Sequence, residues 1–324
     1  MFPNSELNAI LSERLAQWRD LPENGGLPAG AMPGQPLRFY LDTSVIRKLA
    51  SRPEYIATLP AFTSALTLLE LLDGSPTDYG PRASALSAIL KSELSIAPQM
   101  PNVAAARAFT AIDIRRIVHT QAKVMILHVD RAMNLPQVEA EAALAADPEW
   151  QAIRRAYRDM ADLSIQNAIT VGRQLRREFS TSADDQLQRV GIDSALPPDA
   201  RFEAFINGEV NRGATLLVLA SRIAEGFGRG GDDSFEKEIF DSYNGGAEPY
   251  VKALSFTLLD RMRRGQVPAI NDAYDLDHFA YLSPGDVLVT ADKRMAAVAK
   301  HCGVTVVDLA GMDAMLTARD PNAP

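Results

Sequence analysis

The stretch LRFYLDTSVIRKLAS, residues 37–51, decides the fold of this chain because it holds a strand, an acidic corner and the start of a helix. The apolar run Phe39–Leu41 predicts a short buried strand, and Asp42 follows it directly. The residues after the acid, 44–50, are typical of the first turns of a helix. A strand that passes into a helix in this way is typical of a parallel sheet with helices packed on its faces.

The same alternation of strand and helix returns near the other end of the chain. Residues 283–292, SPGDVLVTAD, predict a turn and then a buried strand that is followed by Asp292. The next run, KRMAAVAKHC, predicts a helix, and GVTVVDL after it predicts a last strand. Nearer the start, FTSALTLLELLDG at 62–74 predicts an extended piece and then a helix. We therefore expect an α/β fold with a central parallel sheet.

Between these ends, from about residue 81 to 265, the chain reads almost wholly helical, because Ala, Leu, Arg and Glu dominate and strand-like runs are scarce. The Pro- and Gly-rich stretch at 21–36 indicates a linker behind a short N-terminal helix. The simplest organisation is one discontinuous α/β domain with a helical insertion. The expected boundaries are an N-terminal helix and linker at 1–36, the α/β domain at 37–100 and 266–317, and the insertion at 101–265.

The composition of the 324 residues narrows the class of protein and of site. An apolar share of 47% and a net charge of −8 suit a globular chain and exclude a passive, basic coat for nucleic acid. The single cysteine, Cys302, excludes a disulfide framework and a multi-cysteine zinc site, and the four histidines are well spread. Because we find neither a secretion signal nor a bilayer-spanning apolar run, we expect a cytoplasmic protein without membrane association.

Two acids stand at expected strand ends. Asp42 follows the first strand and Asp292 a later one, and the ligands of a parallel sheet bind beyond the carboxyl ends of its strands. Two acids at such positions are well placed to face one site. The alternative is that each only caps the helix that follows it, since Asp accepts hydrogen bonds from the first free amides of a helix.

Two further acidic segments are candidates for the same site. In LTLLELLDG, Glu70 belongs to a narrow polar stripe on an otherwise apolar helix, so the stripe faces either a polar cleft or water. In NDAYDLDHF, the acids Asp272, Asp275 and Asp277 repel one another, and either a bound cation or exposure to solvent would relieve this repulsion. Alternatively, Asp272 is the N-cap of the helix and the other acids lie in its positive first turn. Carboxylates without cysteine partners favour hard cations such as Mg²⁺ or Mn²⁺, and with them phosphodiester hydrolysis.

The order of these pieces resembles the PIN-domain nucleases, which are metal-dependent ribonucleases of three-layer α/β/α form and include the toxins of many toxin–antitoxin pairs. The matching motifs are LDTS after the first strand, ELLDG on a helix, NDAYDLDHF at the start of a later helix, and VTAD after a later strand. The resemblance covers roughly a third of the chain. The long helical insertion departs from the compact family pattern.

This resemblance implies an endoribonuclease that hydrolyses RNA with Mg²⁺ or Mn²⁺. The implied catalytic and metal-binding acids are Asp42, Glu70, Asp275 and Asp292, with Asp277 as the next choice for the third metal ligand. The residues expected to support the carboxylates or the scissile phosphate are Thr43, Ser44, Thr290 and His278. The expected partners are RNA and, for a toxin, an antitoxin or other regulatory protein, and a homo-oligomer stays open. The alternative is a catalytically silent PIN-like module that binds RNA or protein.

A run of arginines in 150–179 provides the candidate RNA-binding surface. On a helical wheel its arginines fall on one side and its apolar residues on the other, which predicts one amphipathic helix. We expect Arg154, Arg158 and Arg176 to track RNA phosphates. The alternative is a solvated face paired with acidic side chains. A second basic group, at 261–264, precedes the acids of NDAYDLDHF.

Overall fold

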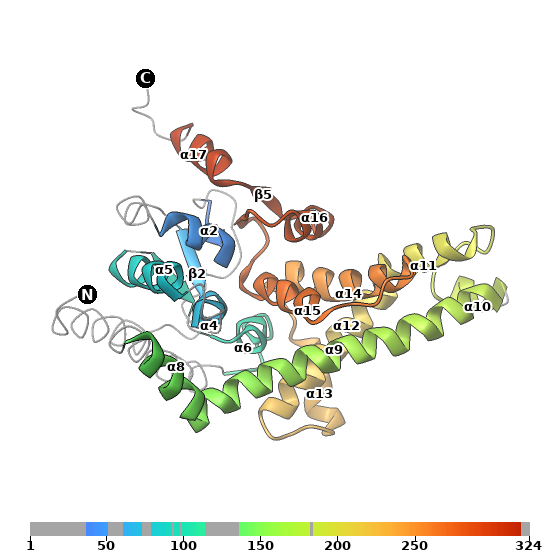
Figure 1. The fold of residues 1–324 in the computed structure, drawn as a ribbon. Helices are drawn as coiled ribbons and strands as arrows, with labels where there is room; N and C mark the ends of the chain where they lie inside the picture. The colour runs from blue at the N-terminus through green and yellow to red at the C-terminus, as the bar shows by residue number, and fades with distance from the viewer. Residues whose placement is uncertain are drawn as a thin grey trace.

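The structure is a computed structural model, and the residues it describes are 37–50, 61–72, 79–92, 94–97, 99–113, 136–181 and 184–318. The N-terminal helix and linker predicted for 1–36 lie outside these residues. The described residues form a parallel sheet from which a long block of helices extends to one side (Figure 1). Among them, no helix is both long enough and apolar enough to cross a membrane.

Five short strands form the central sheet, and every neighbouring pair is parallel. Their order across the sheet is β3-β2-β1-β4-β5, with the bounds Phe39–Leu41 for β1, Ala61–Ser64 for β2, Ser95–Ala97 for β3, Val287–Val289 for β4 and Thr305–Val307 for β5. β1 and β4 are neighbours although they lie far apart in the sequence, and Leu41 pairs with Val289. This register brings the residues that follow the two strands side by side.

The predicted α/β class is confirmed, because a mostly helical chain surrounds an all-parallel sheet. The edge strand β3 is a difference from the sequence prediction, which takes residues from about 81 to 265 as almost wholly helical. β3 has only three residues and, among the described residues, pairs only with β2. Three residues are too few to show the alternation by which a strand is recognised in a sequence.

Helices follow the strands and cover the sheet. They are α2 (Thr43–Leu49), α4 (Ala65–Leu72), α5 (Tyr79–Lys91), α6 (Pro101–Ala106), α16 (Lys293–His301) and α17 (Leu309–Thr317). All residues of β1 and β4 are buried. This is why both strands are continuous apolar runs in the sequence, since a parallel sheet has helices on both of its faces.

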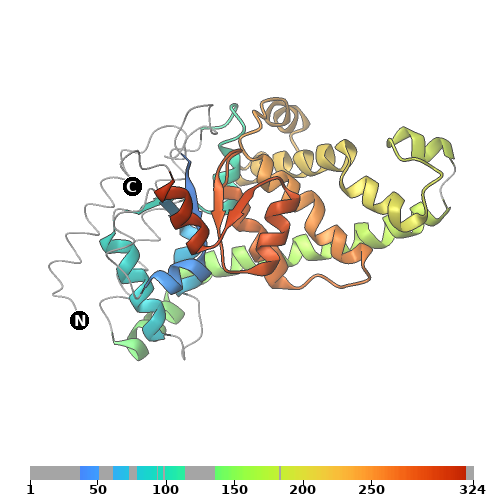
Figure 2. The ribbon, with the colours of Figure 1, turned by 90° about the horizontal axis from the view of Figure 1, so that it is seen from above.

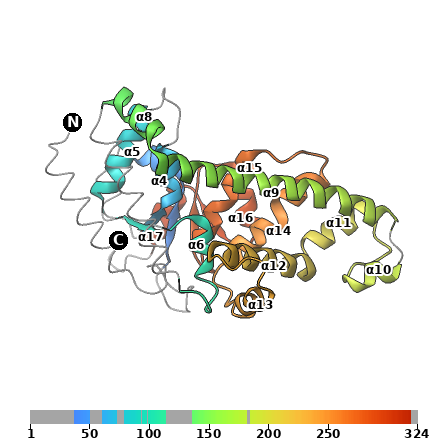
Figure 3. The ribbon, with the colours of Figure 1, turned by 90° about the horizontal axis from the view of Figure 1, so that it is seen from below.

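The helical insertion begins after β3 and α6 and returns to the sheet before β4. Its helices are α8 (Gln137–Ala146), α9 (Pro148–Thr181), α10 (Asp184–Arg189), α11 (Pro198–Ile206), α12 (Glu209–Gly226), α13 (Asp233–Asp241) and α14 (Glu248–Arg263). The helix α15 (Ile270–Asp277) and the 3-10 helix η2 (His278–Tyr281) lead back to β4. The predicted amphipathic helix is confirmed: α9 is a single helix of 34 residues that runs past α15 and α14 (Figure 3).

One hydrophobic core joins the sheet to the near part of the insertion. Trp150 and Tyr157 of α9 are buried in the same core as the strands. A second, smaller core lies farther along α9 and includes Leu175, Phe179 and Phe202. The first half of α9 is therefore fixed against the sheet, while its second half supports an arm that carries α10 and α11 (Figure 2).

A half-buried arginine fixes the segment that leads back into the sheet. Arg107, just after α6, donates to the carbonyl oxygens of Ala280 at 2.6 Å and of Leu282 at 3.0 Å. Carbonyls at a helix end have no partner within the helix and need one from elsewhere. These bonds hold η2, and with it His278, next to β1.

Candidate active site

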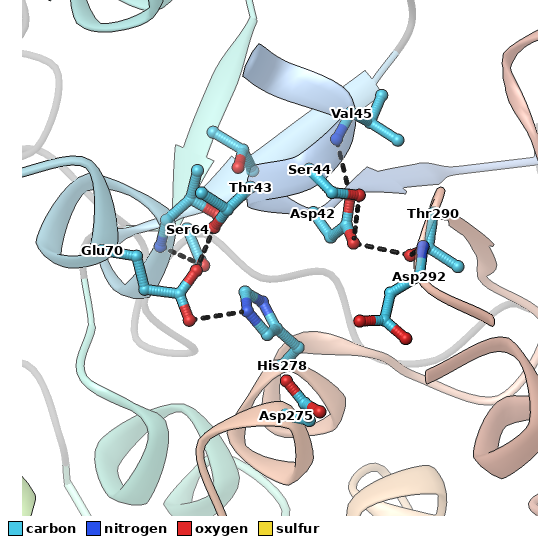
Figure 4. Close-up of polar contacts among 12 residues, drawn as sticks. Asp42, Thr43, Ser44, Val45, Ser64, Glu70, Asp275, His278, Thr290 and Asp292 are labelled. Carbon is cyan, nitrogen blue, oxygen red and sulfur yellow. Dashed lines mark hydrogen bonds and ion pairs between the residues drawn. The ribbon is translucent and has the colours of Figure 1, made fainter. Parts of the chain in front are cut away.

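A pocket of about 650 Å³ lies at the carboxyl ends of β1 and β4. Asp42, Glu70, Asp275 and Asp292 all line it, although they come from four separate segments. Figure 4 shows their carboxylates gathered around His278 and the end of β1. The expected convergence of the four acids is therefore observed, at the edge where a parallel sheet binds its ligands.

Asp42 is both a helix cap and a pocket residue. Its Oδ1 accepts the backbone N–H of Val45 at 2.9 Å, so it caps α2, and only 2% of the residue is exposed. The hydroxyls of Ser44 and Thr290 donate to the same carboxylate, at 2.8 Å and 2.6 Å. Burial raises the pKa of Asp42, and the hydrogen bond from Thr290 acts in the opposite direction. Ser44 and Thr290 thus give this carboxylate the support predicted for them.

Asp292 occupies the equivalent position after β4. Its Oδ1 accepts the backbone N–H groups of Arg294 at 2.6 Å and Met295 at 3.1 Å, which makes it the N-cap of α16. The Thr290 hydroxyl accepts the N–H of Asp292 at 2.9 Å while it donates to Asp42, so one side chain links both acids. At both strand ends, capping and pocket lining therefore occur together.

Glu70 is the one residue of α4 that is not buried. Thr67, one turn earlier on the same face of α4, is fully buried, so this face packs against the protein at Thr67 and opens into the pocket at Glu70. The Glu70 carboxylate accepts a hydrogen bond from the Thr43 hydroxyl and lies 3.2 Å from His278 Nε2. Burial alone would raise the pKa of Glu70, but His278 and the hydrogen bond from Thr43 lower it. The carboxylate is therefore ionised at neutral pH.

A buried chain of hydrogen bonds runs behind Glu70. His278 Nδ1 lies 2.7 Å from Tyr40 Oη, which lies 2.8 Å from Ser64 Oγ. Burial works against a charged ring, yet Tyr40 and Glu70 raise the pKa of His278 well above its ordinary value. Because both ring nitrogens have partners, the imidazole is fixed in one orientation against Glu70.

The sequence analysis does not predict Tyr40 or Ser64 as functional residues, because both lie in short runs that are typical of an ordinary strand. The signal that could have found Tyr40 is chemical. A tyrosine within a fully buried strand needs a partner for its hydroxyl. Here that partner comes from His278, 238 residues farther along the chain.

Asp275 reaches the same pocket from α15. Burial, and next the carboxylate of Asp292, raise the pKa of Asp275 to about 6. A carboxylate close by disfavours the ionised form of Asp275, so negative charge is concentrated at this end of the pocket. Asp275 is thus the member of the 272–277 group that meets the pocket, as the motif order favours.

The other two acids of this segment have structural partners. Asp272 is 4% exposed and forms an ion pair with Arg261 at 2.6 Å. Asp277 accepts a hydrogen bond from Tyr250 at 3.0 Å and does not line the pocket. Residues two apart on a helix point in nearly opposite directions, so Asp275 and Asp277 do not share a face. We therefore remove Asp277 from the candidate metal ligands.

The first part of α9 forms the basic wall of the pocket. Arg154 and Arg158 line it, as the arginine pattern predicts. Arg155 of the same helix and Arg47 of α2 line it too, and both are additions to the predicted set. Four arginines and four acids therefore surround one pocket.

Arg176 is a correction to the predicted RNA-binding set. It does not line the pocket, and its guanidinium donates to the carbonyl oxygens of Met262 and Arg263 at the end of α14. The group at 261–264 is also engaged within the protein, since Arg263 and Arg264 both pair with Asp260. These side chains stabilise the ends of helices in the insertion.

The donors of the pocket can be compared with those of a metal site. The acids offer carboxylate oxygens without cysteine, which is the chemistry that Mg²⁺ and Mn²⁺ prefer. Within the described ranges, no group of three or more His, Cys, Asp or Glu side chains stands close enough to hold a metal ion. By donor type and charge, though not as a ready-made group of three ligands, the acids of the pocket suit a hard divalent cation.

No protein-family model, curated protein or solved structure matches this chain. Similarity thus assigns neither a family nor an activity. What remains is the order of the acidic motifs and the way in which their side chains meet in the pocket.

Proposed function

We propose that this chain is a PIN-like, divalent-metal-dependent endoribonuclease. One observation carries the proposal: Asp42, Glu70, Asp275 and Asp292, the acids selected by the motif order, line one pocket although they lie on four segments. In a chain with 41 acidic residues, an arbitrary set of four has no reason to meet at the carboxyl edge of a parallel sheet.

The chemistry follows from the surroundings of each acid. Asp42, Asp275 and Asp292 would hold the cation, which when bound lowers the pKa of water and stabilises the leaving oxygen. Glu70, ionised and oriented by His278, accepts the proton of the attacking water. The bond from water oxygen to phosphorus forms, and the bond from phosphorus to the sugar oxygen breaks; the sugar oxygen leaves with that electron pair and takes up a proton from solvent to become a hydroxyl.

The basic wall supplies the affinity for the substrate. Arg155 and Arg158 of α9 line the same pocket as the acids and would bind backbone phosphates through charge-assisted hydrogen bonds. A pocket of about 650 Å³ has the size of a small-ligand site, so it admits one flexible strand and not a duplex. We therefore infer a single-stranded substrate.

Cleavage of a labelled single-stranded RNA by the purified chain tests this proposal. We expect cleavage with Mg²⁺ or Mn²⁺, none with EDTA, and none by Asp292→Asn. Asp308→Asn is the matched control, because Asp308 also follows a strand and caps the next helix, α17, but does not line the pocket. Cleavage that survives both EDTA and Asp292→Asn would refute the proposal.

One observation favours a second candidate, a catalytically silent module that binds RNA or protein. Among the described residues no three-ligand metal group is present. RNA that is retarded in a gel-shift assay but never cut, with either cation, would select this candidate. A cytoplasmic toxin with an antitoxin partner extends the first proposal, and predicts growth arrest on expression that Asp292→Asn relieves.

A further inference from the structure

Arg294 of α16 stands among three carboxylates. Its guanidinium nitrogens lie 3.6 Å from Asp275 Oδ2, 3.9 Å from Asp292 Oδ2 and 3.9 Å from Asp272 Oδ1. Asp272 has a closer cation, since Arg261 lies 2.6 Å from the same oxygen. For Asp275 and Asp292, by contrast, no other Lys or Arg of the described residues forms an ion pair. Arg294 is therefore the positive side chain that these two acids share.

The ion pairs of Arg294 are loose. All three of its distances to carboxylate oxygens are longer than a hydrogen bond, and 58% of its side chain is exposed. Arg261 shows the other case, a short contact with a buried acid. A partly hydrated guanidinium without hydrogen bonds to its acids yields readily to a cation that binds carboxylate oxygens directly.

Arg294 approaches the acids from outside the large pocket. It lines a small cavity of about 30 Å³ together with Asp275 and Met295. Asp275 and Met295 also line the large pocket, whereas Arg294 does not. Arg294 thus balances the charge of the acids and leaves the pocket open.

We propose that Arg294 is the resident counter-cation of Asp275 and Asp292, and that a divalent cation bound in the pocket takes over this role. The inference rests on the proposed metal-dependent function. Because Arg294 and the bound cation neutralise the same carboxylates, each lowers the affinity of these carboxylates for the other. Removal of Arg294 therefore tightens cation binding and destabilises chiefly the cation-free protein.

Calorimetric titration of Mn²⁺ into the full-length chain tests the first consequence. The titration is done at about 0.15 M salt, because exposed charges more than ~8 Å apart are then largely screened and only nearby charges affect the cation. We expect Arg294→Gln to bind Mn²⁺ more tightly than wild type, by about 1.4- to fivefold, which is the range that an exposed ion pair of ~0.2–1 kcal/mol supplies. Lys293→Gln is the matched control, since it removes the same charge from the preceding, exposed residue of α16, which forms no ion pair within the described ranges. Its Mn²⁺ affinity should stay close to that of wild type.

Thermal unfolding gives a second readout that does not depend on activity. Without a divalent cation, Arg294→Gln should unfold at a lower temperature than Lys293→Gln. Saturating Mn²⁺ should raise the Tm of Arg294→Gln by more than it raises that of wild type, because a tighter ligand stabilises the folded state more.

The outcomes separate this inference from the proposed function. Equal or weaker Mn²⁺ binding by Arg294→Gln, with binding lost in Asp292→Asn, would overturn the inference and leave the metal-dependent function standing. Mn²⁺ binding that is absent, or that Asp292→Asn leaves intact, would overturn both. Tighter binding by Arg294→Gln in a chain that cuts no RNA would support the counter-cation and refute the nuclease.

Discussion

Replacing Tyr40 by Phe should break the buried chain of hydrogen bonds behind Glu70 and leave the packing intact. The substitution removes only the hydroxyl, which lies 2.7 Å from His278 Nδ1 and 2.8 Å from Ser64 Oγ. The ring keeps its stacking against Tyr281, with centroids 5.8 Å apart. The variant therefore tests whether the orientation of His278 matters for Glu70.

The size of the effect follows from burial. His278 is 2% exposed, so no bulk water replaces the lost hydroxyl at Nδ1. A buried polar atom left without a partner costs ~1–3 kcal/mol, whereas Ser64 Oγ retains the N–H of Thr67 at 3.4 Å. We therefore expect Tyr40→Phe to lower the free energy of unfolding by ~1–3 kcal/mol. RNA cleavage should slow by ~10-fold or more, since loss of a partner that orients an active-site group typically has this effect.

Urea unfolding and RNA cleavage, measured on the same preparations, provide the assay. Tyr281→Phe is the matched control, because Tyr281 is also fully buried but its hydroxyl donates to the Gln99 carbonyl at 2.7 Å. We expect this control to lose stability and to keep its cleavage rate. Equal cleavage rates for Tyr40→Phe and Tyr281→Phe would refute the orienting role, and full stability of Tyr40→Phe would refute the hydrogen bond itself.

Two further predictions concern the basic helix and an ion pair. Arg158→Gln should weaken RNA binding and reduce the slope of log K against log salt by ~0.7, the value for one lost phosphate contact. Arg176→Gln should leave this slope unchanged. Binding titrations at several salt concentrations measure both slopes, and equal slopes for the two variants would contradict the prediction. Burial alone would raise the pKa of Glu248, but the ion pair with Arg212 lowers it. The stability that this pair contributes is therefore complete above the ordinary Glu pKa of about 4.3, and it is lost as the pH falls through the pKa of Glu248 in the folded protein. The difference in unfolding free energy between wild type and Glu248→Gln should accordingly shrink as the pH falls below about 4, and a difference that is constant with pH would contradict the pairing.

The strand-end acids could be predicted from the sequence because their signal is local. A buried apolar run followed by an acid fixes where Asp42 and Asp292 stand, whatever the rest of the chain does. That the two acids meet depends on the pairing of β1 with β4, which no local pattern encodes. The rule that parallel strands present their carboxyl ends at one edge supplied that step.

Arg176 shows what a helical wheel leaves out. The wheel gives the side of a helix on which a residue lies, but not its position along the axis. Arg176 follows Arg154 by 22 residues, which is about 33 Å at ~1.5 Å per residue. The pocket accordingly includes Arg154 but not Arg176, and the two arginines meet different partners. For the same reason, no pattern within α9 could have shown that its first turns, and not its last, reach the acids.

The pocket is a joint product of the sheet and the insertion. Its acids come from segments on both sides of the insertion in the sequence, while Arg154, Arg155 and Arg158 come from α9. Trp150, buried in the common core, fixes the start of α9 where these arginines face the acids. At a net charge of −8 the chain as a whole repels a polyanion, so under the proposed function the attraction of RNA has to be local. The insertion is thus part of the pocket, because without α9 the sheet would present its acids with little of the positive charge that the proposed RNA substrate requires.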